Sequence, residues 1–312
     1  MLDSAILPPP ITHWIDDQYS KACAAGETEV RRLFHGRSGS INEFTQVVID
    51  WLPSIAVIRL YDDLAPDKLA ALVDFLAAKS AINGVLIQER GRKRETKFHI
   101  AYGDVPQQLI VKEMGLSFQI EPLQFQNFGL FLDMRNGRSW LRANALDCKV
   151  LNLFSYTCAF SVAAVAGGAS LVVNVDLSKR ALTIGRTNHQ LNDHVKDATM
   201  FMPYDMLKSW SRIKKPGPYD IVVIDPPSFQ PGSFIAQNDY VKVLRRLNQL
   251  TCDGAKVMLC HNDPGQGSEF IHALMAVECV EFSFVERLAV PEDFAELDVE
   301  KSCKVLVYKK IG

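Results

Sequence analysis

The sequence predicts an α/β protein with a doubly wound, mostly parallel sheet and a small α+β domain ahead of it. From Cys148 onward, predicted strands and helices alternate, which implies parallel strands joined by crossover helices. Two of those strands, in "VLNLF" and "DIVVI", are almost wholly apolar, as expected for buried strands. Between residues 55 and 122 the pattern differs, because short strands follow one another with one helix among them.

The N-terminal region, residues 1–122, is expected to hold the small α+β domain, which is a candidate for substrate recognition. A helix is expected around residues 19–34, and a β-branched strand at 55–61. Apolar spacing then predicts a helix at 65–79. Short strands complete the domain at 83–89, 96–103, 108–115 and 116–122, with turns at 103–104 and 114–115.

The second domain, residues 123–312, is expected to contain a seven-stranded sheet. Its strands are predicted at 149–154, 171–176, 198–203, 219–225, 255–260, 280–288 and 303–309. Helices are predicted between them at 158–168, 179–192, 205–213 and 236–251. Because no clear helix separates the last two strands, they are expected to form an antiparallel hairpin at the end of the sheet.

Composition limits the function classes. The net charge of −2 and the pI of about 6.4 provide no global basic field, so contact with nucleic acid needs a local patch. Residues 31–37 and 89–97 are candidate phosphate-binding segments. Seven cysteines without a C-x-x-C pair argue against a metal site or disulfide framework and favour a cytoplasmic location. No run predicts a signal peptide or a membrane span.

The turn "FSYTCAF" after the first parallel strand lacks the glycines that bring a pyrophosphate against the backbone. Asp176 ends the next strand, where a carboxylate can accept hydrogen bonds from both ribose hydroxyls. The predicted ligand is therefore nucleoside-like, with a ribose and without a diphosphate, which S-adenosylmethionine fits. The alternative is that Asp176 only caps the helix that begins near Ser178.

A second motif, "DIVVIDPPSF", ends another strand with Asp225, Pro226 and Pro227. The prolines hold the chain extended, and their carbonyl groups are free to accept hydrogen bonds from a substrate. Phe229 can stack on a flat ring. A purely structural turn is the alternative, but the order of strands and helices around the motif favours a substrate site.

These motifs resemble class I S-adenosylmethionine-dependent methyltransferases, which have a Rossmann-like fold. Three further segments carry the same resemblance: "NFGLFLDMRNGRSWL" at 127–141, "LND" at 191–193 and "YD" at 204–205. More narrowly, the chain is similar to the bacterial family that methylates large-subunit (23S) ribosomal RNA, with cytosine-C5 and guanine-N7 enzymes among its members. The resemblance implies methylation of a nucleobase of RNA. The PUA domain often found in that family is not expected in residues 1–50.

The resemblance also implies roles for individual residues. Asp176 would hold the ribose, Asp205 would accept from the adenine amino group, and Asp225 with the two prolines would lie beside the methyl donor and target base. Arg135 would pair with the cofactor carboxylate. Further cofactor contacts are implied at Phe131, Asp133, Asn152, Phe154, Ser155, Tyr156, Thr157, Leu177, Ser178, Asn192 and Met206.

Two departures from the family pattern keep other functions open. Cys158 and Ala159 stand where the family usually has two glycines, so they are expected to narrow the approach to the cofactor. After the fifth strand, where the family often has Ser-Cys-Ser, Cys260 stands one position early and His261 takes the place of the cysteine. A thiolate for carbon methylation is therefore less expected than methylation at nitrogen. The alternatives are a noncatalytic RNA-binding protein with this fold and a nicotinamide-dependent oxidoreductase, against which the missing glycines argue.

Overall fold

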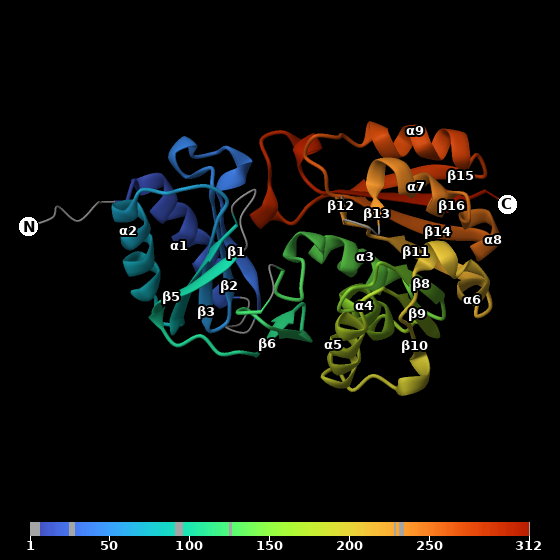
Figure 1. Ribbon diagram of the computed structural model, residues 1–312, viewed down its shortest axis with the longest axis horizontal. Helices are drawn as coiled ribbons and strands as arrows, with labels where there is room; N and C mark the ends of the chain where they lie inside the picture. The colour runs from blue at the N-terminus through green and yellow to red at the C-terminus, as the bar shows by residue number, and fades with distance from the viewer. Residues whose placement is uncertain are drawn as a thin grey trace, which may run out of the picture. The chain divides into compact units, whose positions relative to one another are not determined.

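The computed structural model describes residues 7–24, 29–90, 96–124, 127–227, 229–230 and 234–311, with the backbone alone at 229–230. The chain divides into two compact units (Figure 1). The first contains Met1–Leu132 and Pro291–Asp298, and the second contains Asp133–Val290 and Val299–Gly312. A short segment close to the C-terminus thus belongs to the first unit.

The first unit is built on a five-stranded sheet in the order β1-β2-β3-β4-β5. The strands are β1 (Arg31–His35), β2 (Val47–Leu52), β3 (Ile55–Leu60), β4 (Gly84–Glu89) and β5 (Lys97–Gly103). Only β3 and β4 are parallel, and α2 (Pro66–Ala77) connects them. The other elements are α1 (Pro9–Ala24), η1 (Gly36–Ser38), η2 (Asn42–Phe44), η6 (Glu292–Phe294) and the hairpin β6 (Leu109–Glu113) and β7 (Leu116–Ile120).

The sequence predicts most of the first unit correctly. The strand at 55–61, the helix at 65–79 and the turn at 114–115 are confirmed, and both turn residues have positive φ. The helix expected at 19–34 is wrong, because the helix begins at Pro9, where proline fits a first turn, and ends at Ala24. Residues 31–35 instead form strand β1, which pairs antiparallel with β2. The sequence predicted neither of these two strands.

The two segments expected to bind phosphate have different outcomes. Residues 31–35 form strand β1, in which Arg32 is buried and paired with Asp50, whereas Arg37 of η1 is exposed. In 89–97, residues 91–95 lie outside the described residues.

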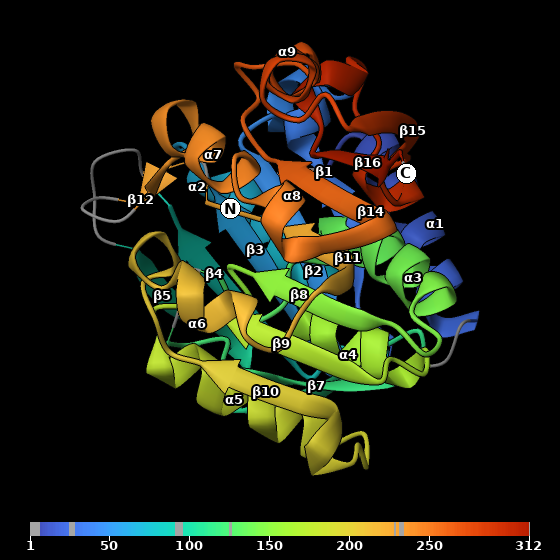
Figure 2. The same cartoon turned by 90° about the vertical axis from the view of Figure 1, so that its right-hand side faces the viewer.

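The second unit holds a seven-stranded sheet in the order β10-β9-β8-β11-β14-β16-β15, and Figure 2 shows its first five strands side by side. β16 runs antiparallel to both of its neighbours, β14 and β15, and the other neighbouring strands of this sheet are parallel. The strands are β8 (Lys149–Leu153), β9 (Leu171–Val175), β10 (Thr199–Met202), β11 (Tyr219–Ile224), β14 (Thr251–His261), β15 (Phe282–Leu288) and β16 (Lys304–Lys310), and a small pair is formed by β12 (Phe229–Gln230) and β13 (Phe234–Ile235).

Helices cover both faces of this sheet. On one face, Ile221 and Val223 of β11 belong to a core with residues of α3 and α4. On the other, Val222 and Ile224 belong to a core with residues of α6, α7, α8 and α9. Burial on both faces explains why the strand reads as a continuous apolar run. The helices are α3 (Arg135–Asn144), α4 (Ala159–Ala166), α5 (Lys179–Gln190), α6 (Trp210–Lys214), α7 (Ala236–Leu244), α8 (Leu247–Leu250) and α9 (Glu269–Glu278), with 3-10 turns η3 (Leu132–Met134), η4 (Lys196–Ala198), η5 (Met206–Lys208) and η7 (Val299–Lys301).

The predicted fold class is therefore confirmed, including the seven strands and the antiparallel pairing of the last two. Two details differ: the helix expected at 236–251 is two helices, α7 and α8, and helices α3 and α9 were not predicted. Among the described residues, no helix is long and apolar enough to span a membrane, and no cluster of His, Cys, Asp and Glu is arranged to hold a metal.

Candidate cofactor and substrate site

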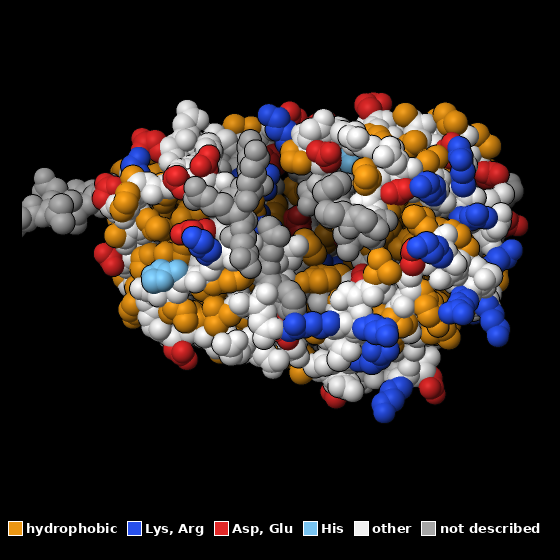
Figure 3. Space-filling view, viewed as in Figure 1, with side chains coloured by type: hydrophobic (Ala, Val, Ile, Leu, Met, Phe, Trp, Pro, Cys, Tyr) orange, Lys and Arg blue, Asp and Glu red, His pale blue; other side chains and the backbone are white. Residues whose placement is uncertain are grey.

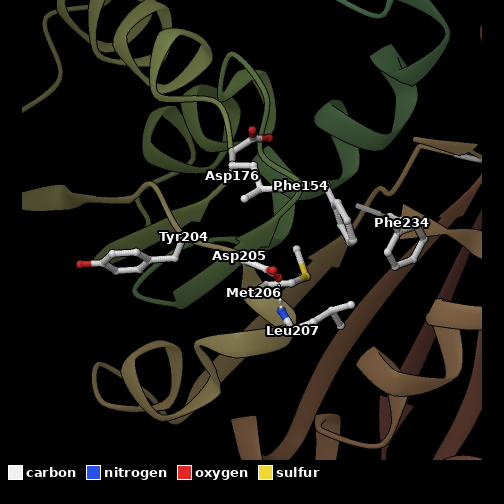
Figure 4. Close-up of a pocket in the computed structure, with 8 residues that line it drawn as sticks. Phe154, Asp176, Tyr204, Asp205, Met206, Leu207 and Phe234 are labelled. Atoms are coloured by element: carbon white, nitrogen blue, oxygen red, sulfur yellow. Dashed lines mark hydrogen bonds between the residues drawn. The ribbon is translucent and has the colours of Figure 1, made fainter. Parts of the chain in front are cut away.

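A pocket open to solvent lies at the carboxyl ends of the parallel strands (Figure 4). Parallel strands deliver the residues that follow them to one edge of the sheet, so turns after β8, β9 and β10 meet there. The lining residues are Phe154, Asp176, Leu177, Tyr204, Asp205, Met206, Leu207 and Phe234. Five of the residues implied by the family resemblance are thus brought together: Phe154, Asp176, Leu177, Asp205 and Met206.

Asp176 joins the turns after β8 and β9. Its Oδ2 accepts a hydrogen bond from Tyr156 N at 2.8 Å, and its Oδ1 accepts one from Ser178 N at 2.8 Å. Burial raises the pKa of Asp176, and these two N–H donors oppose that rise. The capping alternative is wrong, because the N-cap of α5 is Ser178, whose hydroxyl accepts from Ala181 N at 3.1 Å. Each carboxylate oxygen keeps a lone pair for a ligand.

The turn after β8 reaches its shape without glycine. Phe154, Tyr156 and Cys158 have φ of 57°, 46° and 64°, a region that costs an ordinary residue about 1 kcal/mol. Contacts to neighbouring elements hold it: Ser155 N donates to Val175 O at 3.1 Å, and Asn188 Nδ2 of α5 donates to Thr157 O at 2.9 Å. The surrounding structure therefore stabilises a backbone that the local sequence disfavours.

Cys158 does not line the pocket. Its side chain is fully buried and is directed toward Gly185 of α5, where an added Cβ would lie 2.4 Å from the Cys158 sulfur. The extra volume at Cys158, where the family usually has glycine, is accommodated by a glycine on the facing helix. The Cys158 side chain therefore does not narrow the approach to the cofactor, contrary to the expectation from the sequence.

This packing gives a prediction for Gly185→Ala. We expect the free energy of unfolding to fall by about 1–3 kcal/mol, because the new methyl group overlaps the Cys158 sulfur and Cβ. Cys158→Gly in the same protein should recover most of that loss. Denaturant unfolding of the parent, the two single variants and the double variant gives the interaction free energy between positions 158 and 185. An equal loss from Gly185→Ala with and without Cys158 would contradict the contact.

Asn152 lies inside the sheet and away from the pocket. Its Nδ2 donates to Asn174 Oδ1, whose amide donates to Ser161 Oγ, each at 2.9 Å. Ser161 Oγ contacts His189 Nε2 at 2.9 Å, and burial lowers the pKa of His189 to about 3, so this ring is neutral. This buried chain ties β8, β9, α4 and α5 together. Asn192 also bonds within its own turn, from Nδ2 to Asn188 O at 2.7 Å.

Asp205 follows β10 and is the N-cap of η5, since its Oδ1 accepts from Leu207 N at 3.0 Å. Its Oδ2 lies 3.1 Å from the ammonium group of Lys208, which is largely exposed. Opposite it, Phe154 and Phe234 meet edge to face with ring centroids 4.7 Å apart, forming an apolar wall of the pocket. Sequence reasoning missed Phe234, because nothing in its spacing places β13 beside the turn after β8.

Asp225 follows β11 and forms a second charged group with residues at the start of α3. Burial raises the pKa of Asp225 to about 7, nearby Asp133 adds to the rise, and Arg138 opposes it. Arg138 is almost fully buried, whereas the predicted cofactor partner Arg135 is half-buried. The sequence did not single out Arg138, because a buried arginine has no local signature.

Several predicted residues remain unplaced or structural. The side chain of Phe229 lies outside the described residues, and Phe131 belongs to the first unit. Cys260 is fully buried in the core on β14, where burial raises the pKa of its thiol well above its usual value, with a further contribution from Asp225. The thiol is therefore protonated at neutral pH.

The fold and pocket define a nucleoside-binding α/β protein: acidic side chains follow two adjacent strands, and the turn has no cradle for a pyrophosphate. A model of the S-adenosylmethionine-dependent methyltransferase family matches residues 31–309, from β1 to β16. The chain belongs to this family.

Individual relatives agree. The chain is 30% identical over 192 residues to ribosomal RNA large subunit methyltransferase K/L of Pseudoalteromonas translucida, covering 60% of this chain but only 27% of that protein. It is 28% identical over 291 residues to a candidate ribosomal RNA large subunit methyltransferase, YwbD, of Bacillus subtilis, covering 88% of this chain and 72% of that one. The solved structure of SMU.776, a candidate methyltransferase complexed with SAH, superposes with a TM-score of 0.84 at 25% identity, over 96% of this chain and 80% of the other.

Proposed function

We propose that this protein transfers the methyl group of S-adenosylmethionine to a nucleobase of RNA, with ribosomal RNA as the substrate class and the cytoplasm as its location. The observation that carries the proposal is the pocket itself. It brings together Asp176, which would hold the ribose, and Asp205, which would accept from the adenine amino group. These residues follow β9 and β10, and β8 lies between β9 and β11, the strand that Asp225 follows.

The residues present fit the cofactor. Asp176 has acceptor positions for the two ribose hydroxyls, and Leu177 and Met206 supply apolar surface for the adenine ring. Asp205, whose side chain is 36% exposed, can accept from the adenine amino group. The edge-to-face pair Phe154 and Phe234 supplies apolar surface for the remaining part of the molecule. When bound, S-adenosylmethionine supplies an electrophilic methyl group, and the protein's contribution is alignment.

RNA as the substrate is supported by the names of the relatives and by local charge. The two relatives above are both named ribosomal RNA large subunit methyltransferases. Figure 3 shows Lys and Arg side chains gathered over the region where Figure 1 draws α5 and α6. Exposed members of this group on η5 and α6 and just beyond are Lys208, Arg212, Lys214 and Lys215. A local patch of this kind can contact phosphates although the net charge of the chain is −2.

The experiment that tests the proposal is transfer of a labelled methyl group. Purified protein is incubated with methyl-labelled S-adenosylmethionine and, separately, with unmodified ribosomal RNA, DNA and a protein mixture. We expect label in the RNA alone, and nuclease digestion followed by nucleoside analysis then identifies the methylated atom. Label in DNA or protein, or no label in any substrate although the cofactor binds, would contradict it.

Methylation at nitrogen is the chemistry that the second charged group favours. Carbonyl groups of Pro226 and Pro227 and the Asp225 carboxylate are acceptors for an amino or ring N–H, and transfer to nitrogen needs no covalent nucleophile. Methylation at cytosine C5 needs a thiolate, and Cys260 is buried and protonated.

We therefore expect Cys260→Ser to keep activity within about threefold of the parent, because no covalent step passes through this sulfur. Initial rates of methyl transfer at saturating RNA check this. Cys279→Ser is the matched control, since Cys279 is also buried in the second unit and lies in its other core. A loss of two or more orders of magnitude confined to Cys260→Ser would instead establish a covalent mechanism.

A further inference from the structure

One face of the five-stranded sheet in the first unit carries charge where its other face carries the apolar core. Side chains alternate along a strand, so Ile49 and Ile58 join the core beneath α1 and α2. Asp50 and Arg59 are directed to the opposite face. Arg32 of β1 pairs in register with Asp50 and lies on that face too.

Two buried arginines on this face converge on one carboxylate. Arg32 Nε and Arg59 Nη1 each lie 2.9 Å from a carboxylate oxygen of Asp50, which has no exposed surface, and both arginine side chains are 10% exposed. Two guanidinium groups therefore share one carboxylate in a place shielded from water. The Nε of Arg59 is buried and has no hydrogen-bond partner among the described residues. A buried donor of this kind indicates a site that is not fully satisfied by the protein itself.

Positive charge continues outward at the carboxyl ends of β3 and β4. These strands are parallel, so Tyr61 and Arg90, which follow them, are neighbours, and Arg90 Nη1 donates to the Tyr61 hydroxyl at 3.0 Å. The guanidinium group of Arg37 lies 4.6 Å from the centre of the Tyr61 ring. Arg37 is exposed, and Tyr61 and Arg90 are half-buried, so the cluster runs from the interior to solvent.

The surrounding arginines also act on the Tyr61 hydroxyl. Burial acts to raise the pKa of Tyr61, but the four surrounding arginines outweigh it and bring the pKa below its usual value. Other carboxylates of the first unit near this cluster are already engaged. Glu296 accepts from His35 at 2.8 Å, and Asp293 accepts from Arg32 N at 3.0 Å.

We propose that Arg37, Tyr61 and Arg90 form a binding site for a backbone phosphate of the RNA substrate, with Arg32 and Arg59 behind them supplying positive field. A phosphate oxygen accepts from guanidinium groups in a fork geometry and from a tyrosine hydroxyl. The inference rests on the proposed function, because that function supplies the RNA substrate. The proposed contact involves residues that are distant in sequence from those that line the pocket. It gives the first unit the role of holding the RNA strand.

The test measures RNA affinity separately from cofactor affinity. A fluorescein-labelled single-stranded fragment of ribosomal RNA is titrated with full-length protein by anisotropy, at salt concentrations from 50 to 200 mM. The variants are Arg37→Gln, Tyr61→Phe and Arg90→Gln. The matched control is Arg245→Gln, which removes an exposed arginine at the C-cap of α7 that pairs with Glu278 and so changes net charge equally. Binding of S-adenosylmethionine is measured by calorimetry for every protein.

We expect Arg37→Gln and Arg90→Gln each to weaken RNA binding about 3- to 10-fold and to reduce the slope of log affinity against log salt by about 1, the change for one phosphate contact. Tyr61→Phe should weaken binding about 2- to 5-fold, the loss of one hydrogen bond. Arg245→Gln should leave both quantities unchanged, and no variant should alter cofactor affinity.

Two results would overturn the inference. If the variants bind RNA with the parent's affinity and salt slope while their melting temperatures fall, the cluster has only a structural role, and the proposed function stands if the parent still methylates RNA. If the parent itself neither binds nor methylates RNA, both the inference and the proposed function are wrong.

Discussion

Asp176→Ala is expected to weaken S-adenosylmethionine binding by about two orders of magnitude. In the proposed function the carboxylate accepts two hydrogen bonds from ribose hydroxyls, and charge-assisted bonds of this kind contribute about 1.5 kcal/mol each. The same oxygens also accept from Tyr156 N and Ser178 N, so the alanine variant loosens the turn after β8 as well. Isothermal calorimetry at pH 7.5 measures the loss.

Asp176→Asn separates binding from folding. It keeps the volume of the side chain but directs an amide N–H₂ toward groups that need an acceptor, so at least a tenfold loss of affinity is expected. Because one oxygen cannot accept from both Tyr156 N and Ser178 N in the present geometry, the melting temperature is measured as well, and a smaller decrease than for Asp176→Ala is expected. Asp197→Asn is the control, since Asp197 is exposed on η4. Unchanged cofactor affinity in a folded Asp176→Asn protein would remove Asp176 from the site.

Asp225→Asn is expected to reduce methyl transfer by about two orders of magnitude, the lower range for a group that exchanges or accepts a proton in the reaction. Because the pKa of Asp225 is about 7, kcat/KM of the parent should rise between pH 6 and 8 as the carboxylate forms and accepts from the target N–H. In the variant, kcat/KM should not rise between pH 6 and 8. A parent profile that is flat from pH 6 to 8 would show that ionised Asp225 is not needed.

The same substitution has a second, opposite effect on stability. In the unfolded chain the pKa of Asp225 is about 4, whereas in the folded protein it is about 7. The folded state therefore holds this proton more tightly, so stability is fully present below pH 4 and falls as pH rises through 7. Asp225→Asn removes the cost of the buried charge. At pH 8 it should melt at a higher temperature than the parent, with an unfolding free energy larger by up to about 4 kcal/mol, and at pH 4 it should match the parent.

The sequence by itself determined the architecture of the second unit and the acidic residues that define its pocket. The alternation of apolar strands with helices is a local pattern, so β8, β9 and β11 were predicted within about a residue. Asp176 ends one predicted strand, and Asp205, which the family resemblance implied, lies two positions after another; parallel pairing brings the ends of these strands to one edge. Their positions at one edge could therefore be inferred without coordinates.

Only the tertiary structure decided which side chains are exposed, paired or buried. Cys158 looked like an obstacle in the cofactor turn, yet its side chain fits against Gly185, a position 27 residues further along the chain. Asn152 followed the motif but bonds inside the sheet, and Cys260 is buried with a protonated thiol. The arginine cluster around Tyr61 joins β1, β3 and β4 through a strand pairing that the sequence did not reveal. Local patterns fix secondary structure because they depend on neighbours along the chain, whereas burial and charge balance depend on residues that only folding brings together.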